Sequence, residues 1–494
     1  MPLTTPMRLF LLIVCACLPF TCQAQNDTIP QNILFTKDSV LKVSYLADTA
    51  SFVVIRNLLV KGNNRTRKGI ILRELDLHQA DTIETNKLTL VLLRNRNQVY
   101  NTGLFNDVTL SLQNQQGNQA DLLVEVAERW YIFPVPIFKL TDRNFNDWWV
   151  THHHDFARTE YGIQFKHENF RGRREKLSLT LQWGYNRKIE LIYQIPSLNK
   201  NGNTGINPYI SYIVNHEIAY QSVLNKQVFW KDTTDFVRKR IRAGIAVVHR
   251  TDLYRTHLIH GGYIENHIAD TIAQLNPDYF LDGKNSQKYF FLQYVYTADL
   301  RNLRAYPLSG SYLRFSCYKA GIGSGQNANL LWLTIRYTHY FPLAKKWYAL
   351  ANVLAKTSFP QKQSYYIQQG LGFGNDYLRG YEYYVIDGQH YGVARGALRF
   401  ELLKKKFKTP IIKTKQFDHI PVSIYLKTYI ETGYVRDDYF APKNPLNNLL
   451  ANKFLYSTGV GFDLLTFYDR VLSMEYSLNG EKEWGLFVSF KSNY

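Results

Sequence analysis

The last eleven residues, Trp484 to Tyr494, read WGLFVSFKSNY, and this stretch decides the fold. Successive side chains of an extended chain point to opposite faces. One face then carries Trp484, Leu486, Val488 and Phe490, and the other carries Gly485, Phe487, Ser489 and Lys491. A terminal strand with one apolar face and aromatic residues is typical of the strand that closes a transmembrane β-barrel. The edge strand of a soluble barrel has the same pattern, so the upstream sequence must separate the two interpretations.

The same alternation repeats upstream. In the stretch from Leu177 to Gly184, LSLTLQWG, apolar and polar residues alternate throughout. Candidate strands begin near Phe133, Glu160, Glu175, Lys188, Gly205, Val237, Tyr254, Lys288, Ser311, Ala328, Trp347, Tyr391, Pro421, Phe454, Arg470 and Trp484. Each of these sixteen strands, with its connection, takes roughly 22 residues, which suits membrane strands of about 9–11 residues. We therefore predict an all-β, antiparallel, sixteen-stranded transmembrane barrel over residues 131–494.

Charged residues lie on the polar face of several predicted strands. Arg399 and Glu401, for example, alternate with Leu398, Phe400 and Leu402. A soluble sandwich places such charges on its outer face, whereas a membrane barrel turns them toward its lumen. Alternation alone does not say which face is wet. The choice of a membrane barrel depends on the N-terminal segment, the terminal strand and the strand count together.

The N-terminal residues 1–24 have the pattern of a secretory signal peptide. Arg8 precedes the apolar run Leu9–Phe20, and Cys22-Gln23-Ala24 forms a small-x-small cleavage site. The run is too short to cross a bilayer as a helix. We expect a mature chain that begins at Gln25, with a flexible lead over residues 25–50.

Cysteine usage limits the chemistry of the exported chain. Cys22 is an alternative lipidation site, but the preceding Pro19-Phe20-Thr21 fits a lipobox poorly. Cys317 is the only cysteine that remains after signal cleavage, so the mature chain has no internal disulfide.

The composition agrees with a barrel and argues against nucleic-acid binding. The chain contains 36 Tyr, 29 Phe and 8 Trp, although its mean hydropathy is only −0.29. Aromatic girdles and a polar lumen produce this combination, and a large soluble all-β protein is the competing interpretation. The net charge of +19 often indicates a nucleic-acid partner. Export makes a polar lumen and anionic lipid head groups the better explanation.

Residues 51–130 are predicted to form a separate α+β unit of order β-α-α-β-β. Phe52–Val60 is a predicted strand, followed by the turn Gly62-Asn63-Asn64 and a helix that Thr66 caps and that runs to about Leu75. A second helix is predicted from Glu84 to about Tyr100, with Leu88, Leu92 and Val99 near one face. The remaining strands are Val108–Leu112 and Leu122–Val126, joined by the polar turn Gln113–Gln119.

This unit closely resembles a POTRA domain, the periplasmic module of the BamA-like outer-membrane superfamily, or bacterial surface antigen family. The resemblance covers about Phe52 to Pro136. Its marks are the strand that leads into Gly62-Asn63, the turn Gly103-Leu104-Phe105, and the final strand that ends with Val126 and Glu128.

The predicted barrel carries further motifs of the same superfamily. NFRGRREKLSL, from Asn169, and DLRNLRAYPLSGSYL, from Asp299, resemble two of its hairpins. Leu378-Arg379-Gly380-Tyr381 resembles its Val/Leu-Arg-Gly-Tyr/Phe loop, which folds into the lumen of relatives. The strand Tyr429–Val435 resembles a later strand of the family, with Glu431 where Asp is usual. The chain is thus identified as a short member of the superfamily with one POTRA domain.

An inserted loop needs an anchor in the lumen. An arginine held by carboxylates provides a strong and directional one. Alternation turns Glu431, Asp463 and Glu475 toward the polar face, with Lys427 as a competitor for Glu431. We expect Arg379 to bind an inward carboxylate, Glu431 first and Asp463 second.

The resemblance implies a function in assembling or inserting outer-membrane proteins, or in moving a polypeptide across the membrane. Its implied partners are outer-membrane lipids, unfolded outer-membrane protein clients and accessory lipoproteins, with no nucleic acid. The POTRA domain would lie in the periplasm and would offer a sheet edge to client strands. A two-partner-type secretion pore and a passive porin remain alternatives. No enzymatic activity, cofactor or metal is expected.

Other motifs carry less weight. The run His152-His153-His154-Asp155 has metal-ligand chemistry, but a loop beside the aromatic girdle explains it better. Gly370, Gly372 and Gly374 are not a dinucleotide fingerprint, because no βαβ unit surrounds them. The sequence has no Gly-x-Ser-x-Gly and no His-Glu-x-x-His motif.

Overall fold

The computed structural model describes a large part of the chain. The described residues are 51–140, 156, 159–199, 201–232, 234–323, 328–374, 376–408, 419–443, 445–466 and 469–491. The predicted signal peptide, the lead over residues 25–50 and the run His152–Asp155 lie outside them. Among the described residues, no helix combines the length and the hydrophobicity that crossing a bilayer requires.

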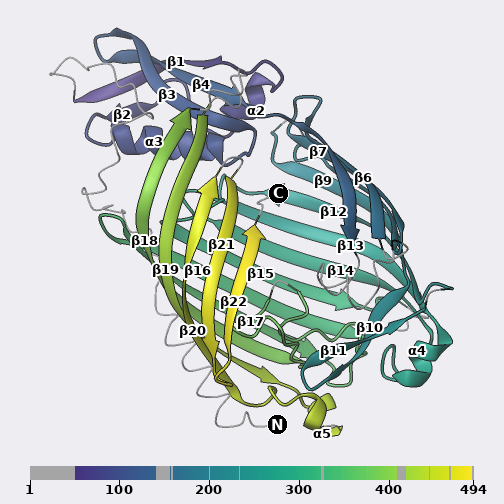
Figure 1. The fold of residues 1–494 in the computed structure, drawn as a ribbon. Helices are drawn as coiled ribbons and strands as arrows, with labels where there is room; N and C mark the ends of the chain where they lie inside the picture. Colours follow the sequence, from purple (N-terminus) through teal and green to yellow (C-terminus); the bar gives the residue numbers. More distant parts are fainter. Residues whose placement is uncertain are drawn as a thin grey trace. The chain divides into compact units, whose positions relative to one another are not determined.

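Residues 52–128 form an α+β unit around a four-stranded sheet (Figure 1). Its elements are β1 (Phe52–Lys61), α2 (Lys68–Leu72), β2 (Thr82–Glu84), α3 (Leu88–Tyr100), β3 (Phe105–Gln116) and β4 (Gln119–Glu128). The strand order is β2-β1-β4-β3, with β1 and β4 parallel and the other pairs antiparallel. The predicted POTRA-like order is confirmed, with the short β2 added between the two helices.

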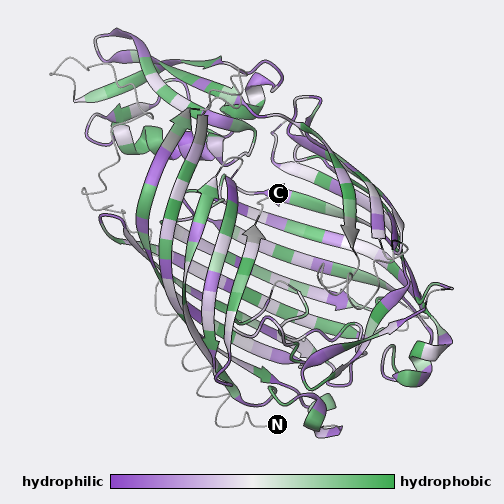
Figure 2. Cartoon of the chain, viewed as in Figure 1, coloured by the Kyte–Doolittle hydropathy of each residue, from purple (hydrophilic) through white to green (hydrophobic). Residues whose placement is uncertain are grey.

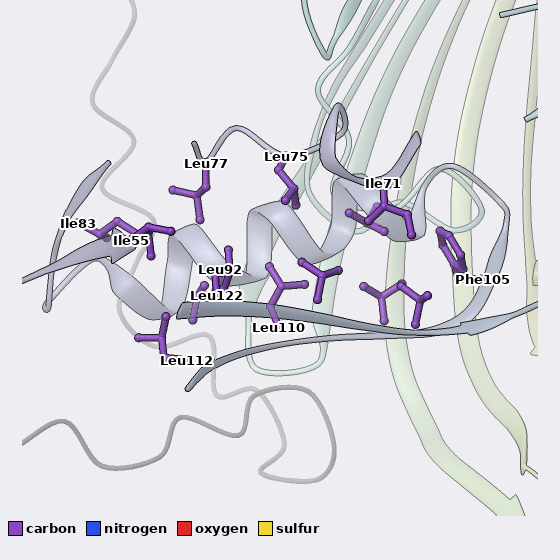
Figure 3. Close-up of a cluster of buried hydrophobic side chains, with 14 of the residues drawn as sticks. Ile55, Ile71, Leu75, Leu77, Ile83, Leu92, Phe105, Leu110, Leu112 and Leu122 are labelled. Carbon is purple, nitrogen blue, oxygen red and sulfur yellow. The ribbon is translucent and has the colours of Figure 1, made fainter. Parts of the chain in front are cut away.

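The core of this unit lies between α3 and the sheet (Figure 3). Leu92 and Val99 are fully buried on one face of α3, and Leu88 is 2% exposed. Leu110 and Leu122 cover them from the sheet and are also fully buried. The face of α3 that helical spacing predicts is therefore the face that packs.

Two local predictions in this unit are wrong. Thr66 does not cap the first helix, because α2 begins two residues later with Arg67 at its N-cap. The Thr66 hydroxyl instead contacts the Tyr131 hydroxyl at 3.0 Å. The second helix begins at Leu88 rather than Glu84, since Glu84 pairs with Phe52 in the edge strand β2. Pairing to β1 satisfies this backbone before the helix can begin.

Backbone conformation and close contacts explain the two glycines of the POTRA-like motif, Gly62 and Gly103. Gly62 has φ +89°, and a Cβ there would lie 2.0 Å from the Val126 carbonyl oxygen. Gly103, with φ +77°, reverses the chain just after α3. The turn then places Leu104 and Phe105 in the core, where they are at most 2% exposed.

The core of the α+β unit predicts a contrast between two leucines of α3. Leu92→Ala should destabilise the unit by about 2–5 kcal/mol, because it leaves a cavity in a packed core. Leu90→Ala should have little effect, since Leu90 is 42% exposed. Hydrogen exchange of the β4 amides in the full-length protein measures the loss of stability in each variant. Equal protection of these amides in the two variants would contradict the assignment of the core.

The rest of the chain forms one sixteen-stranded antiparallel sheet that curves into a barrel (Figure 1). The predicted strand number is confirmed. The strands are β5 (Ile132–Leu140), β6 (Thr159–Phe170), β7 (Glu175–Gly184), β8 (Arg187–Gln194), β9 (Thr204–Asn215), β12 (Arg238–Arg250), β13 (Arg255–Ile268), β14 (Ser286–Asp299), β15 (Gly310–Ala320), β16 (Leu330–Ala344), β17 (Trp347–Phe359), β18 (His390–Lys408), β19 (His419–Arg436), β20 (Phe454–Thr466), β21 (Arg470–Asn479) and β22 (Trp484–Lys491). Each strand pairs with the next one in this series.

The two faces of the sheet differ as the alternation predicts (Figure 2). The outer face exposes large apolar side chains, for example Trp183 at 41% and Ile430 at 68%. The inner face carries polar groups, such as Thr180 and Gln182, that are at most 7% exposed. An apolar exterior over a polar interior is the inverse of a soluble protein and suits a lipid environment.

Four segments at one end of the barrel form a structure that the sequence did not predict. They contain the hairpin of β10 (Glu217–Val223) and β11 (Lys226–Lys231), helix α4 (Asp270–Leu275), the loop over residues 360–389, and the loop with α5 (Phe440–Lys443) and η3 (Pro445–Asn447). We call these segments the cap. Their apolar side chains form a common cluster that includes Ile218, Ile272 and Tyr365.

Asn225 at the tip of the hairpin joins three parts of the cap. Leu224 and Asn225 both have positive φ, as a tight two-residue hairpin turn requires. The Asn225 side chain is 2% exposed; its amide donates to the Val385 carbonyl at 3.0 Å and its oxygen accepts from the Leu450 amide at 3.0 Å. The hairpin is therefore fastened to both long loops.

Asp387 gives the cap a pH dependence. Burial raises the pKa of its carboxyl to about 7, and its Oδ1 has no hydrogen-bond partner among the described residues. The folded protein keeps this proton up to about pH 7, whereas the unfolded chain loses it near the ordinary value of 3.8. The contribution of Asp387 to stability therefore falls as pH rises from about 4 to about 7.

Asp387→Asn should remove this part of the pH dependence and stabilise the cap at neutral pH. Urea unfolding in detergent at pH 5 and pH 8 measures the difference between variant and wild type. Asp270→Asn, an exposed position of the cap, is the matched control. A variant that keeps the wild-type pH slope would exclude Asp387 as its source.

Candidate lumen anchor and seam

The loop between β17 and β18 packs against the inner face of the barrel. Its Gly380 has φ +83°, and a Cβ there would lie 3.3–3.5 Å from Asn479, Ser477 and Ser457 on β20 and β21. Asn479 also donates to the Gly380 carbonyl at 2.9 Å. A glycine therefore lets the loop backbone touch the wall and places the preceding side chain against it.

That preceding side chain, Arg379, is held by two carboxylates. Its Nε donates to Glu431 Oε1, its backbone amide donates to Glu431 Oε2 at 3.0 Å, and its Nη1 donates to Glu475 Oε1 at 3.0 Å. Its guanidinium lies 3.8 Å from the ring centroid of Tyr429. Glu431 is 1% exposed and also pairs with Arg395 at 3.4 Å. The structure thus brings Arg379, Glu431 and Glu475 together.

Asp463 has other partners. Lys427 bridges Asp463 and Glu475, with 2.7 Å to the latter. The Tyr306 hydroxyl donates to Asp463 Oδ2 at 2.8 Å. Lys427, the expected competitor for Glu431, therefore neutralises the neighbouring acids instead. With Arg379 and Arg395 it balances these three carboxylates, and Glu382 lies beside them as a further carboxyl group whose pKa burial raises to about 7.

Apolar and polar contacts fix the loop on either side of Arg379. Tyr381 is 2% exposed, and its hydroxyl accepts a hydrogen bond from the Gly480 amide at 3.0 Å. Leu378 is 1% exposed in the same apolar cluster. Asp376 pairs with Arg336 on β16 and accepts a 3.0 Å hydrogen bond from Tyr391. The loop is thus attached to widely separated strands of the wall.

Sequence reasoning missed four residues of this site, which are Arg395, Tyr306 and the pair Asp376–Arg336. Arg395 lies directly opposite Glu431 in the sheet, so a register prediction would have found it. Tyr306 belongs to the turn after β14 and stacks on Tyr425 at 4.6 Å. The hairpin motif that begins at Asp299 contains this turn, but the motif gives no sign that the turn reaches inward.

The terminal strand β22 is an edge of the sheet. It pairs with β21 from Leu478↔Trp484 to Val471↔Lys491, and this register includes Phe490 opposite Leu472. Trp484, Leu486 and Val488 are 59–61% exposed on the outer face. Over the described residues the sheet runs from β22 to β5, and no pairing joins these two strands. We call the junction between β22 and β5 the seam.

A cavity of about 700 Å³ lies between β22 and the inserted loop. Gly485 and Phe487 line it from the strand, and Tyr383 and Tyr384 line it from the loop. The Phe487 ring covers Gly485, where a Cβ would lie 2.5 Å from it. The Arg379 loop therefore lies beside the seam as well as in the lumen.

These contacts predict an energetic coupling between Arg379 and Glu431. Arg379→Lys should destabilise the loop, because lysine keeps the charge but lacks the planar fork and the stacking on Tyr429. In a double-mutant cycle with Glu431→Gln, the coupling should be about 1–3 kcal/mol. Urea unfolding of the detergent-solubilised protein gives the four free energies of unfolding.

The cycle of Arg379→Lys with Asp463→Asn is the comparison. Asp463 does not contact Arg379, so this coupling should be clearly smaller than that with Glu431. Additive effects of Arg379 and Glu431 would show that other contacts hold the loop.

Two family descriptions match the sequence. The Omp85 superfamily domain matches residues 169–465. POTRA, described as the surface antigen variable number repeat, matches residues 53–129. The comparison with curated proteins found no match.

Solved structures resemble the fold at low sequence identity. BamA from Haemophilus ducreyi lacking POTRA domains 1–3 is 16% identical with a TM-score of 0.50, over 89% of this chain and 85% of that one. CdiB from Escherichia coli is 12% identical with a TM-score of 0.46, over 92% of each chain. CdiB from Acinetobacter baumannii is 12% identical with a TM-score of 0.45, over 89% and 73%.

Proposed function

Because the chain belongs to the Omp85 superfamily, we propose that it is an outer-membrane barrel that assembles or inserts outer-membrane proteins. Proteins of this superfamily are insertion or secretion barrels of the outer membrane. The observation that carries the proposal is a POTRA domain on the same chain as a sixteen-stranded sheet whose two terminal strands, as far as the structure describes them, are not paired with each other.

The edge of β22, which has no neighbour among the described strands, is where a client strand would bind. An edge strand presents free backbone N–H and C=O groups that an extended polypeptide can bind by β-augmentation. In a lipid environment unpaired backbone groups are costly, so an added strand is strongly favoured. A client strand would extend the sheet while its apolar side chains continue the outer face.

The α+β unit supplies a second edge. Strand β3 is the edge of its sheet, next to β4, and it is twelve residues long. In the proposed function this unit lies in the periplasm and meets unfolded outer-membrane clients before the barrel does. Accessory lipoproteins are proposed as further partners, and lipids surround the barrel.

The inserted loop supports the strands nearest the seam. Arg379 holds β19 and β21 together through Glu431 and Glu475, and Gly380 touches β20 and β21. If the seam opens, the strands behind it must keep their register. We propose that Arg379, Gly380 and Tyr381 keep them in place, and that the protein acts without catalysis.

Export of a partner polypeptide is the second candidate. The superfamily includes secretion barrels, and the same lumen would then conduct an extended chain. A passive porin is a weaker alternative, because it leaves the POTRA domain without a role. Insertion and export differ in where a client contacts the barrel: at the seam for insertion, and in the lumen for export.

Photo-crosslinking from Leu486 tests the proposal. A photoreactive residue at this outward position of β22 should capture newly exported outer-membrane proteins, since a client strand would lie beside it. Ile430 on β19 is the matched control, because it is equally lipid-exposed but both edges of its strand are paired. Client adducts at Leu486 and not at Ile430 support insertion at the seam.

Equal labelling at both positions, or lipid adducts alone, would refute insertion at the seam. Client adducts from a lumen position, such as Arg314 on β15, would favour export instead.

A further inference from the structure

Several buried polar side chains, on the inner face and in the cap loop against it, have atoms without a hydrogen-bond partner among the described residues. Asn266 on β13 is fully buried, and both its Nδ2 and Oδ1 are unpaired. Gln287 on β14 and Gln368 in the cap loop are each 1% exposed; Gln287 lacks a partner at Oε1 and Gln368 at both Nε2 and Oε1. Buried amide groups in proteins are almost always hydrogen-bonded, so such a group of exceptions requires an explanation.

The strand register places Asn266 and Gln287 beside two arginines, and Gln368 follows in the loop that covers them. Asn266 lies directly opposite Arg240 on β12 and directly opposite Gln287 on β14. Arg242 lies two residues along β12 on the same face. The Nε atoms of Arg240 and Arg242 are shielded from solvent and also lack partners. We call Arg240, Arg242, Asn266, Gln287 and Gln368 the polar row.

A turn of the cap loop covers the polar row. Gln287 donates to the Ser364 hydroxyl at 3.4 Å, and Arg240 donates to the Tyr366 hydroxyl at 3.1 Å. The backbone N–H of Gln368 closes the turn by donating to the Ser364 carbonyl at 2.9 Å. The loop that carries Arg379 therefore also covers this second place on the wall, five to seven strands away from β19 in the sheet order.

The charge of this place is not balanced by the protein. The described partner of Arg240 is the Tyr366 hydroxyl, and that of Arg242 is the Tyr209 ring. Within the described residues, neither arginine makes an ion pair with a carboxylate. The lumen cluster around Arg379, in contrast, pairs every cation with an acid. Both arginines are half-buried, and a positive charge that is partly withdrawn from water favours an accompanying anion.

We propose that the polar row is a binding site for one inorganic phosphate. Two guanidinium groups suit a tetrahedral oxyanion in both charge and geometry. The unpaired amide oxygens of Asn266, Gln287 and Gln368 also need a donor. Hydrogen phosphate carries an O–H and both accepts and donates, whereas sulfate at neutral pH only accepts. Water would satisfy the amides but would leave the arginine charges unbalanced.

Bound phosphate would join the β12–β14 wall to the turn at Ser364–Gln368. The inserted loop would then have an anion-dependent attachment on one side of the barrel and the Arg379 attachment on the other. This inference does not depend on which polypeptides the barrel handles.

Equilibrium dialysis of the full-length protein in detergent with radiolabelled phosphate tests the proposal. Wild type should bind one phosphate per chain, and Arg240→Gln/Arg242→Gln should weaken binding by roughly tenfold or more, since it removes both charged donors. Arg314→Gln is the matched control, because Arg314 also faces inward, opposite Arg336, but lies outside the polar row. Its binding should equal that of wild type.

Gln368→Leu provides a second test that leaves the arginines in place. It should weaken phosphate binding several-fold, and phosphate should slow hydrogen exchange of residues 364–368 in wild type but less in this variant. Competing sulfate should bind more weakly than phosphate. Absence of saturable binding by wild type, unchanged binding in both polar-row variants, or sulfate binding equal to phosphate would overturn the proposal.

Discussion

The guanidinium of Arg379 lies between Glu431 and Glu475 on the inner wall, and this contact sets the position of the loop around it. Taking one charge of such a pair out of a shielded site costs about 3–5 kcal/mol, because the remaining charge stays unpaired. The cluster avoids that cost by including Arg395 and Lys427, so that three cations meet three acids. Gly380 then lets the backbone touch β20 and β21, and Tyr381 fills the apolar space beyond.

The loop brings together parts of the barrel that the sheet itself keeps apart. At Arg379 it contacts β19 and β21 near the seam, and at Ser364 to Tyr366 it contacts β12 and β14 on the other side. Within the cap, Asn225 of the β10–β11 hairpin binds the same loop at the Val385 carbonyl. Over the described residues β22 and β5 do not pair with each other, and such a sheet lacks the closure that normally holds a barrel rigid. Contacts across the lumen supply part of that rigidity from within.

The lumen cluster near the seam and the cap differ in whether their buried ionisable groups have partners of opposite charge. Near the seam the buried cations are paired with acids, whereas Asp387 in the cap keeps a proton to about pH 7 and the polar row retains arginine Nε atoms that have no partner among the described residues. Neutral clusters hold their geometry over a wide range of conditions. Groups that depend on a proton or an anion respond to conditions instead, and in this protein both lie in or under the cap.

The sequence by itself determined the strand number, the direction of the side chains and the identity of the α+β unit. Alternation has a period of two and needs only neighbouring residues, so sixteen strands and the exposed faces of Trp183 and Leu486 followed from local patterns. The helix face with Leu92 and Val99 followed from helical spacing for the same reason. Thr66 and Glu84 were misplaced because pairing to β1 and packing of Tyr131, which are distant in sequence, replaced the local cap.

Only the tertiary structure decided which inward groups meet. Alternation turns Glu431, Asp463 and Glu475 to the same face but says nothing of their depth along the barrel. Asp463 lies opposite Tyr425, six positions from Glu431 on β19, which is about 20 Å along a strand. Arg379 therefore reaches Glu431 and not Asp463. The hairpin at Asn225 and the polar row likewise depend on the register of distant strands and on the path of one long loop, which no local pattern encodes.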